Sequence, residues 1–383
     1  KASNTLSTSK NKIEFFPLSE LKEGMRGKAE TVFSGNVPQA FDVEILGLIP
    51  SGIGPRQDMI VGRISGGNAD RTHVFAGMSG SPVYINGKLV GAISYAFPFS
   101  KEAICGITPI DQMVKIFEEN QKTRTAPTKP RAISFAELAS TNHKSNFPKR
   151  SVVTSSLLSD VNSRSPIHKL VGQSFQPIAT PLAISGISQA TLNQFASELN
   201  SVGLMPVAAA GSGSKITKIK KATPNTLTGG TSVMMALMRG DMSFAASGTV
   251  TLRDGEKIYA FGHPFLSLGS SNLPMSESHV VTVVPNLNNS FKMAVADDIV
   301  GTTTQDRATG VYGKLGKTPK MIPVSLKMRT SRNQEKDYNF EFVRDDFLSP
   351  ILLNMAMSNS IVSFERGLGN MTVSVNGKID IKG

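Results

Sequence analysis

Tryptophan is absent from this sequence of 383 residues, and cysteine occurs once, as Cys105. A single cysteine cannot form a disulfide within the chain, so a cysteine-rich secreted scaffold and a zinc-knuckle site are both excluded. The residues around it, KEAICGITPI, are mostly apolar. They predict a small side chain buried in a core rather than a reactive thiol.

Long apolar runs are missing as well. No stretch reaches the roughly 18–20 residues that a helix needs to span a bilayer. The first residues, KASNTLSTSKNK, are polar and lack the apolar core of a signal peptide. If the protein is exported, this sequence corresponds to a mature form without its leader, and we expect an extracytoplasmic location, in the periplasm or secreted.

Acidic residues are few compared with basic ones, 29 against 41, which gives a net charge of +12. Most of the excess lies in residues 121–150 and 211–225, where Glu137 is the single acid. Both stretches are rich in Ser, Thr, Pro or Gly and predict exposed loops. Such loops serve either as solvated linkers or as weak contacts to an anionic surface. Aromatic residues are not interleaved with the charges, so no specific nucleic-acid site is predicted.

The first part of the chain has the pattern of short antiparallel strands. After an expected flexible tail at 1–14, alternating runs such as FDVEILGLI, DMIVGRIS and SPVYINGKLVGAISY are broken by Gly, Pro and Asn. Asn86-Gly87 predicts a type I′ hairpin turn. The stretch ITPIDQMVKIFEEN changes to a helical period, with an apolar face formed by Ile110, Met113, Val114 and Phe117. We therefore expect a β-barrel with a closing helix over residues 15–120.

The rest of the chain begins with an expected basic linker, residues 121–175. A small α/β insertion follows over 176–227, with strand PIATPLAISG, a helix capped by Ser188 and stopped by Gly203, and strand LMPVAAA. The strand pattern resumes over 228–383. It ends in a predicted helix, FLSPILLNMAMSNSIVSFERG, and a strand pair that turns at Asn376-Gly377. No internal repeat of fixed period was found.

The stretch GMSGSP, which contains Ser79, has two interpretations. Gly/Ser turns between strands are common, so it can be a simple turn. Alternatively, Ser79 is a nucleophile, because small residues let successive N–H groups point into one pocket for a developing oxyanion. The N–H groups of Gly77 and Ser79 would then form the oxyanion hole. The hairpin, the strand GITPI and the helix that follow resemble the C-terminal barrel of chymotrypsin-like proteases, which favours the nucleophile.

A serine nucleophile needs a base, and histidine is scarce, with five in the chain. His73 is only six residues before Ser79, too close to reach round as a base, and we expect a surface or structural role for it. His263, in KIYAFGHPFLSLG, lies in a Gly-His-Pro turn after a strongly alternating run and can present its ring rigidly. The others are His143, His168 and His279.

GMSGSPVYINGKLVGA and AFGHPF together resemble the sporulation stage IV B peptidases, over about residues 17–120 and 228–315. In that family the histidine segment precedes the serine segment. The resemblance therefore implies a mainly β, chymotrypsin-like double β-barrel in circularly permuted order, with a small α/β insertion. Triad order differs freely between unrelated folds, so permutation does not affect the chemistry.

The acid that would orient His263 is open. The family places an aspartate before the serine, where this sequence has VGRISGGNAD, with Ser65 near the position and Asp70 the only acid. A chymotrypsin-like barrel would supply it after the histidine, in AVADDIVGTTTQDR, with Asp297, Asp298 and Asp306. Asp306 is our candidate, with a turn aspartate that caps backbone N–H groups or pairs with Arg307 as the alternative. A Ser–His dyad is the third option.

The sequence thus predicts a serine endopeptidase of restricted, regulatory or self-processing specificity, acting on a protein or peptide substrate, with its own chain as one candidate. The alternative is an inactive protease-fold binding or adaptor protein at the bacterial envelope. Phe97 and Phe99 are candidates for a substrate-pocket wall from their place in a loop. The sequence lacks H-E-x-x-H and phosphate-loop motifs, and no cofactor or metal is expected. Oligomeric state has no signal in the sequence.

Overall fold

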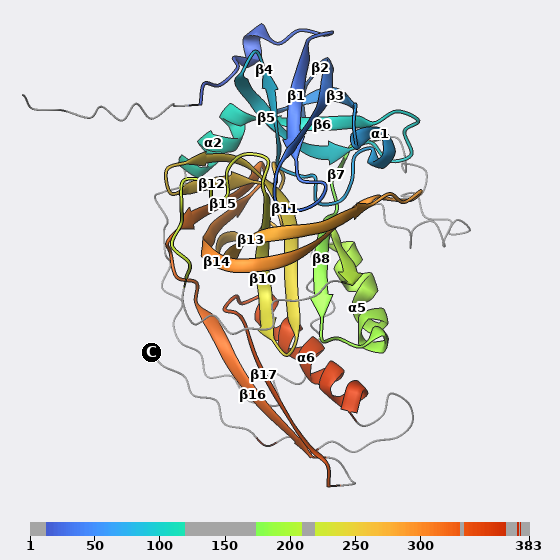
Figure 1. Ribbon diagram of the computed structural model, residues 1–383, viewed down its shortest axis with the longest axis vertical. Coiled ribbons are helices and arrows are strands. Elements are labelled where there is room, and N and C mark those ends of the chain that lie inside the picture. The colour runs from blue at the N-terminus through green and yellow to red at the C-terminus, as the bar shows by residue number, and fades with distance from the viewer. Residues whose placement is uncertain are drawn as a thin grey trace, which may run out of the picture.

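The computed structural model describes residues 13–118, 174–208, 219–329 and 333–364, together with Ser374 and Asn376. Two sheets dominate it, with one six-stranded antiparallel barrel in each, stacked along the long axis of the molecule (Figure 1). This is the chymotrypsin-like double-barrel arrangement expected from the sequence. No helix in these ranges is long and apolar enough to cross a membrane.

The first barrel, here called the serine barrel, closes through β4 to β1, β2, β3, β6, β5 and back to β4. Its elements are 3-10 helix η1 (Leu18–Glu20), β1 (Arg26–Thr31), β2 (Gln39–Gly54), β3 (Gln57–Ser65), α1 (Ala69–Thr72), β4 (Ser81–Ile85), β5 (Lys88–Ala96), β6 (Ile104–Pro109) and α2 (Ile110–Glu118). The β4–β5 turn has Asn86 at φ 51° and Gly87 at φ 75°, the conformation of the predicted type I′ hairpin. Cys105 is fully buried in the apolar core of this barrel, as predicted.

The second barrel, the histidine barrel, closes through β10, β13, β14, β15, β12, β11 and back to β10. Its strands are β10 (Ser232–Gly240), β11 (Ser243–Asp254), β12 (Lys257–Ala260), β13 (Gly269–Val284), β14 (Phe291–Arg307) and β15 (Gly310–Leu315). Long alternating runs in β13 and β14 place apolar side chains inside, where Leu273, Met275 and Val300 join a large core.

Further elements extend the second sheet on both sides. The predicted strand–helix–strand unit is β8 (Thr180–Ser185), α5 (Gln189–Ser201) and β9 (Leu204–Ala208), with β8 parallel to β9 and paired to β11. The N-cap Ser188 accepts a hydrogen bond from the N–H of Thr191, as predicted. At the other edge lie β16 (Met321–Arg329) and β17 (Glu335–Val343), followed by α6 (Leu348–Phe364), the helix predicted for this region.

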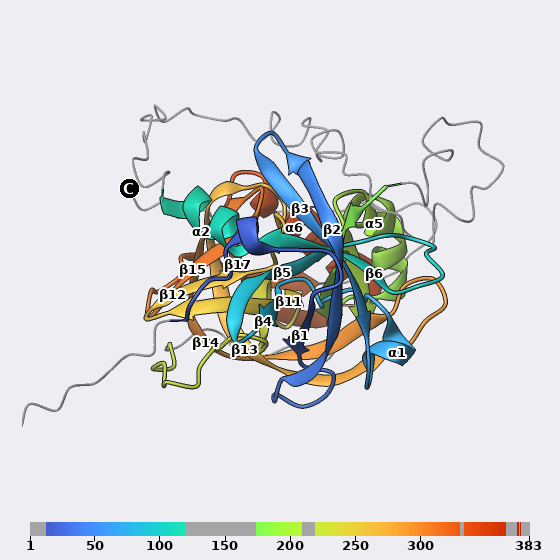
Figure 2. The same cartoon turned by 90° about the horizontal axis from the view of Figure 1, so that it is seen from above.

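The two barrels share an interface in which α2 takes part. Its apolar face is Ile110, Met113 and Phe117, as predicted, but Phe117 stacks on Tyr312 of the histidine barrel with 5.4 Å between ring centroids. Figure 2 shows α2 beside β12 and β15, while α5 lies on the opposite side. The basic linker apart from its last residues and most of the N-terminal tail lie outside the described residues, and so does Gly377 of the predicted turn at Asn376-Gly377.

Candidate active site

Ser79 lies in a tight turn, residues 75–81, between α1 and β4. The N–H of Met78 donates to the carbonyl of Phe75, and both the N–H and the hydroxyl of Ser81 donate to the carbonyl of Met78. Gly77 and Gly80 have φ of +92° and +99°, in the region that favours glycine. Neither the N–H of Gly77 nor that of Ser79 donates to an acceptor in the described part of the chain. The turn thus contains two N–H donors without an acceptor in that part of the chain, and an oxyanion hole requires such donors.

His263 lies in a second turn, residues 260–268, which follows β12. Phe261 and Gly262 have φ of 69° and 68°, and the chain there lies directly on the serine barrel. A Cβ at Gly262 would lie 2.9 Å from the Cβ of Ser94, so only glycine fits. The hydroxyl of Thr108 donates to the carbonyl of Gly262 over 2.6 Å. The His263 turn is therefore held against strands β5 and β6 of the serine barrel.

Thr249 of β11 connects the two turns. Its N–H donates to the carbonyl of Ser79 over 2.9 Å, and its carbonyl accepts from the N–H of Phe261. The N–H of Gly80 in turn donates to the carbonyl of Ile93, next to Ser94. The Ser79 turn and the His263 turn, almost two hundred residues apart in the chain, are thus held together from opposite barrels, while no hydrogen bond joins the Ser79 hydroxyl to the His263 ring.

Both side chains are withdrawn from solvent. Ser79 is 0% and His263 1% exposed. The Ser79 hydroxyl has no hydrogen-bond partner among the described residues. An unpaired buried hydroxyl costs free energy, and such a group is common where a structure is built for chemistry rather than stability.

The imidazole of His263 is oriented by its own turn. Its Nδ1 lies 2.8 Å from the carbonyl oxygen of Pro264, and the rings of Phe261 and Tyr95 lie edge-on to it. A carbonyl only accepts, so Nδ1 carries the proton in this contact and donates it. The neutral ring then has its lone pair on Nε2, the atom that a general base uses.

Asp306, near the end of β14, supports the same turn. Its Oδ1 accepts from the N–H of Phe265 over 2.7 Å, and its Oδ2 accepts from the N–H groups of Leu266 and Leu268. Asp306 thus caps backbone N–H groups, which is the alternative to a triad acid that the sequence left open for this residue. The Pro264–Phe265 peptide therefore faces His263 through its carbonyl and Asp306 through its N–H. Asp306 as the acid of a triad stays a prediction.

The other acidic candidates lie elsewhere. Asp70 accepts from the N–H of Gly66 in the loop after β3. Asp297 and Asp298 are exposed on β14, where Lys220 lies 3.8 Å from Asp298. His73 and His279 are exposed, and His143 and His168 lie outside the described residues.

Lys292, on β14, was not identified from the sequence. It is fully buried beside the Ser79 turn: its Nζ donates to the hydroxyl of Thr249, which donates to the carbonyl of Gly77. Its Cβ would be 2.9 Å from a Cβ at Gly77. Burial lowers the pKa of Lys292 from 10.5 to about 7. Within FKMAVADD a lysine on a strand is expected to face solvent. No signal in the neighbouring residues indicates that it is buried.

The lowered pKa of Lys292 should make the stability of the fold depend on pH. Above about pH 7 the folded chain lacks a proton that the unfolded chain keeps up to about pH 10, so the free energy of unfolding should rise with pH in that window. The slope from this group reaches about 1.4 kcal/mol per pH unit at most. Urea unfolding from pH 7 to 9.5 should show this slope in the parent and a flatter one in Lys292→Met. The exposed Lys314→Met variant is the control and should keep the parent slope; equal slopes in all three would contradict the prediction.

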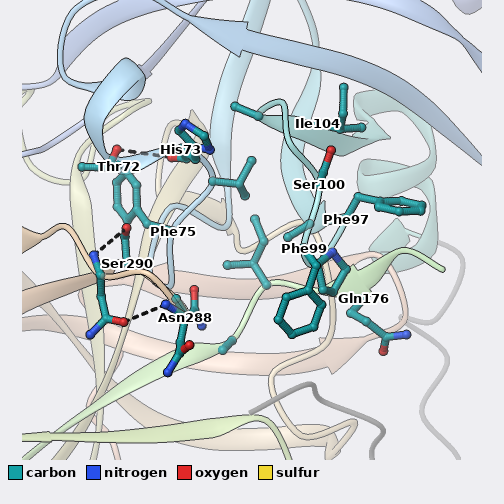
Figure 3. A pocket seen from close by; sticks show the side chains of 18 of the residues that line it. Thr72, His73, Phe75, Phe97, Phe99, Ser100, Ile104, Gln176, Asn288 and Ser290 are labelled. Atoms are coloured by element: carbon teal, nitrogen blue, oxygen red, sulfur yellow. Dashed lines mark hydrogen bonds between the residues drawn. The ribbon is translucent and has the colours of Figure 1, made fainter. Parts of the chain in front are cut away.

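A pocket of about 340 Å³ opens beside the Ser79 turn. Figure 3 shows Phe97 and Phe99 on one side with Gln176, and Thr72, Phe75 and Ser290 on the other. Phe97 and Phe99 thus lie at a pocket, and their contact with substrate stays a prediction. His73 also lines it, in a strained backbone conformation with φ 52°.

Comparison with models of known protein families gives a match to the first part of the chain. Residues 1–114, which span the serine barrel with the Ser79 turn, match the family model described as SpoIVB peptidase S55. No curated protein and no solved structure matches the chain. Over this segment the chain is similar to the SpoIVB peptidases.

Proposed function

We propose that this protein is a serine endopeptidase of restricted specificity. One observation carries the proposal: the Ser79 turn and the His263 turn meet from opposite barrels, and Thr249 is hydrogen-bonded to the backbone of both, at Ser79 and at Phe261. In the proposed reaction Nε2 of His263 takes the hydroxyl proton as Ser79 attacks the peptide carbonyl. The N–H groups of Gly77 and Ser79 stabilise the oxyanion. Collapse of this intermediate gives an acyl-enzyme as His263 protonates the leaving amine, and water then releases the acid.

Full burial of Ser79 and His263 supports a regulatory or self-processing role over a digestive one, because a large substrate reaches them only after the residues that cover them have moved. The same burial also favours the second candidate, an inactive binding or adaptor protein. The proposal includes an extracytoplasmic location. It also includes a circularly permuted relation to the sporulation stage IV B peptidases, since here the serine barrel precedes the histidine barrel.

A fluorophosphonate probe distinguishes the two candidates, because it phosphonylates only a serine that is activated by its surroundings. We expect stoichiometric labelling, and peptide mapping by mass spectrometry should locate the adduct on Ser79. Ser81, two residues away with its hydroxyl bound to Met78, serves as an internal control. Folded protein that takes up no label under any condition, including after displacement of residues 174–179 from the edge of β5, would favour the adaptor.

A further inference from the structure

We propose that residues 174–179 occupy the edge of β5 on which a peptide substrate binds, so that the chain covers its own Ser79. The blocking of catalysis by this segment rests on the proposed function, but occupation of the β5 edge can be tested without catalysis. The segment contains β7 (Gln176–Pro177), which joins the serine barrel to β8 (Figure 1).

The segment is bound as an added strand. Gln176 pairs with Ala96 and Pro177 with Tyr95, antiparallel, and the N–H of Ile178 donates to the carbonyl of Ser94 over 3.0 Å. β4 pairs with β5 only as far as Ile93, so beyond it this edge of β5 is open to another strand. Extended peptides are recognised in this way, by main-chain hydrogen bonds to a sheet edge with pockets for alternate side chains.

The edge leads directly to the candidate catalytic groups. Ser94 follows Ile93, whose carbonyl accepts from Gly80 of the Ser79 turn, and Ser94 also lies against Gly262 of the His263 turn. A chain that is hydrogen-bonded to Ser94 therefore lies close to both turns.

The chain then crosses the Ser79 turn. Ile178, 4% exposed, packs in the same apolar cluster as Phe75. The next residue, Ala179, packs against Ala76, and Pro181 lies 3.2 Å from where a Cβ of Gly77 would be. Residues 178–181 thus run alongside residues 75–77 of the Ser79 turn.

The occupant also indicates which peptides fit. The position of Ile178 takes an aliphatic side chain into an apolar site, and the next position, against Ala76, takes a small one. Upstream, Phe175 lies edge-on to Phe97, with 5.1 Å between ring centroids. We infer a substrate class of extended peptides with an aliphatic residue followed by a small one, which must compete with this segment.

The test measures binding of a fluorescein-labelled peptide, SFQPIATPL, which is the sequence of residues 174–182. All chains carry Ser79→Ala, so the result does not depend on hydrolysis. Ile178→Asp should release the segment from the edge of β5. Peptide binding should then strengthen about tenfold or more, because a larger fraction of the molecules has this edge free to bind the peptide. Ile322→Asp, on β16 far from the site, is the matched control and should bind as the parent does. The peptide SFQPDATPL should bind weakly to all of them.

Ile178→Ala is a milder variant in case the acidic one does not fold, and it should shift binding in the same direction. Equal peptide affinity in the parent and in a folded Ile178 variant would overturn the proposal, even if Ser79 is labelled by fluorophosphonate. A different result is tighter peptide binding in the Ile178 variant, while the same variant with Ser79 restored takes up no fluorophosphonate. That result would support occupation of the β5 edge by residues 174–179 and contradict the proposed peptidase activity.

Discussion

Replacing His263 with alanine should lower kcat/KM for peptide hydrolysis by about 10⁴-fold or more, as should replacing Ser79. Without the imidazole, the Ser79 hydroxyl has no base to take its proton, and the leaving amine has no acid. The measurement is hydrolysis of SFQPIATPL by the Ile178→Ala chain, in which the β5 edge is more open, with each further substitution added. Peptide binding should change little, so the loss should appear in kcat.

The double variant separates a cooperative pair from two independent effects. Because Ser79 and His263 act as one unit, Ser79→Ala with His263→Ala should be no slower than either variant alone. His279→Ala is the matched control, an exposed histidine on β13 of the same barrel, and should keep full activity. Losses that multiply in the double variant, or activity that survives in His263→Ala, would contradict the assignment of His263 as the base.

Asp306→Asn should have the second largest effect, on both stability and turnover. Both carboxylate oxygens accept backbone N–H bonds, three in all, and an amide replaces one oxygen with a donor. At least one buried N–H then faces another donor. Such a loss costs about 1–3 kcal/mol per unpaired group, so we expect the free energy of unfolding to fall by about 2–4 kcal/mol.

The effect on turnover follows from the Pro264–Phe265 peptide. If its N–H loses Asp306, its carbonyl no longer holds the ring of His263 at a fixed position. A displacement of about 1 Å can reduce turnover about 10²-fold, and we expect that decrease in kcat with KM little changed. Asp298→Asn, an exposed site on the same strand, should be neutral. A folded Asp306→Asn chain with normal kcat would show that Asp306 has only a structural role.

Local signals in the sequence predicted the local structure well. The hairpin at Asn86-Gly87 and the capped helix after Ser188 were predictable because their determinants are adjacent residues. Alternation identified strands, but their pairing depends on distant partners: β10 pairs with β13 and β17, which no short-range pattern specifies.

The candidate site divides in the same way. GMSGSP and AFGHPF identified Ser79 and His263 by their turn chemistry. Lys292 could not be found, because its burial results from packing of β14 against Thr249 and the Ser79 turn. The role of residues 174–179 was also hidden, since FQPIAT resembles any link between domains until β5 lies beside it.

The contact through Thr249 has a consequence for the timing of activity in the cell. Ser79 belongs to the barrel that a ribosome makes first, and Thr249 and His263 belong to the barrel that it makes last. Domains tend to fold in the order of their synthesis, so a nascent chain completes its serine barrel before His263, the proposed base, is made. In a chain with the opposite order, where the histidine barrel precedes the serine barrel, the serine would be made last. If the proposed function holds, a growing chain carries an inert serine until the second barrel is made, and proteolysis starts only when that barrel docks.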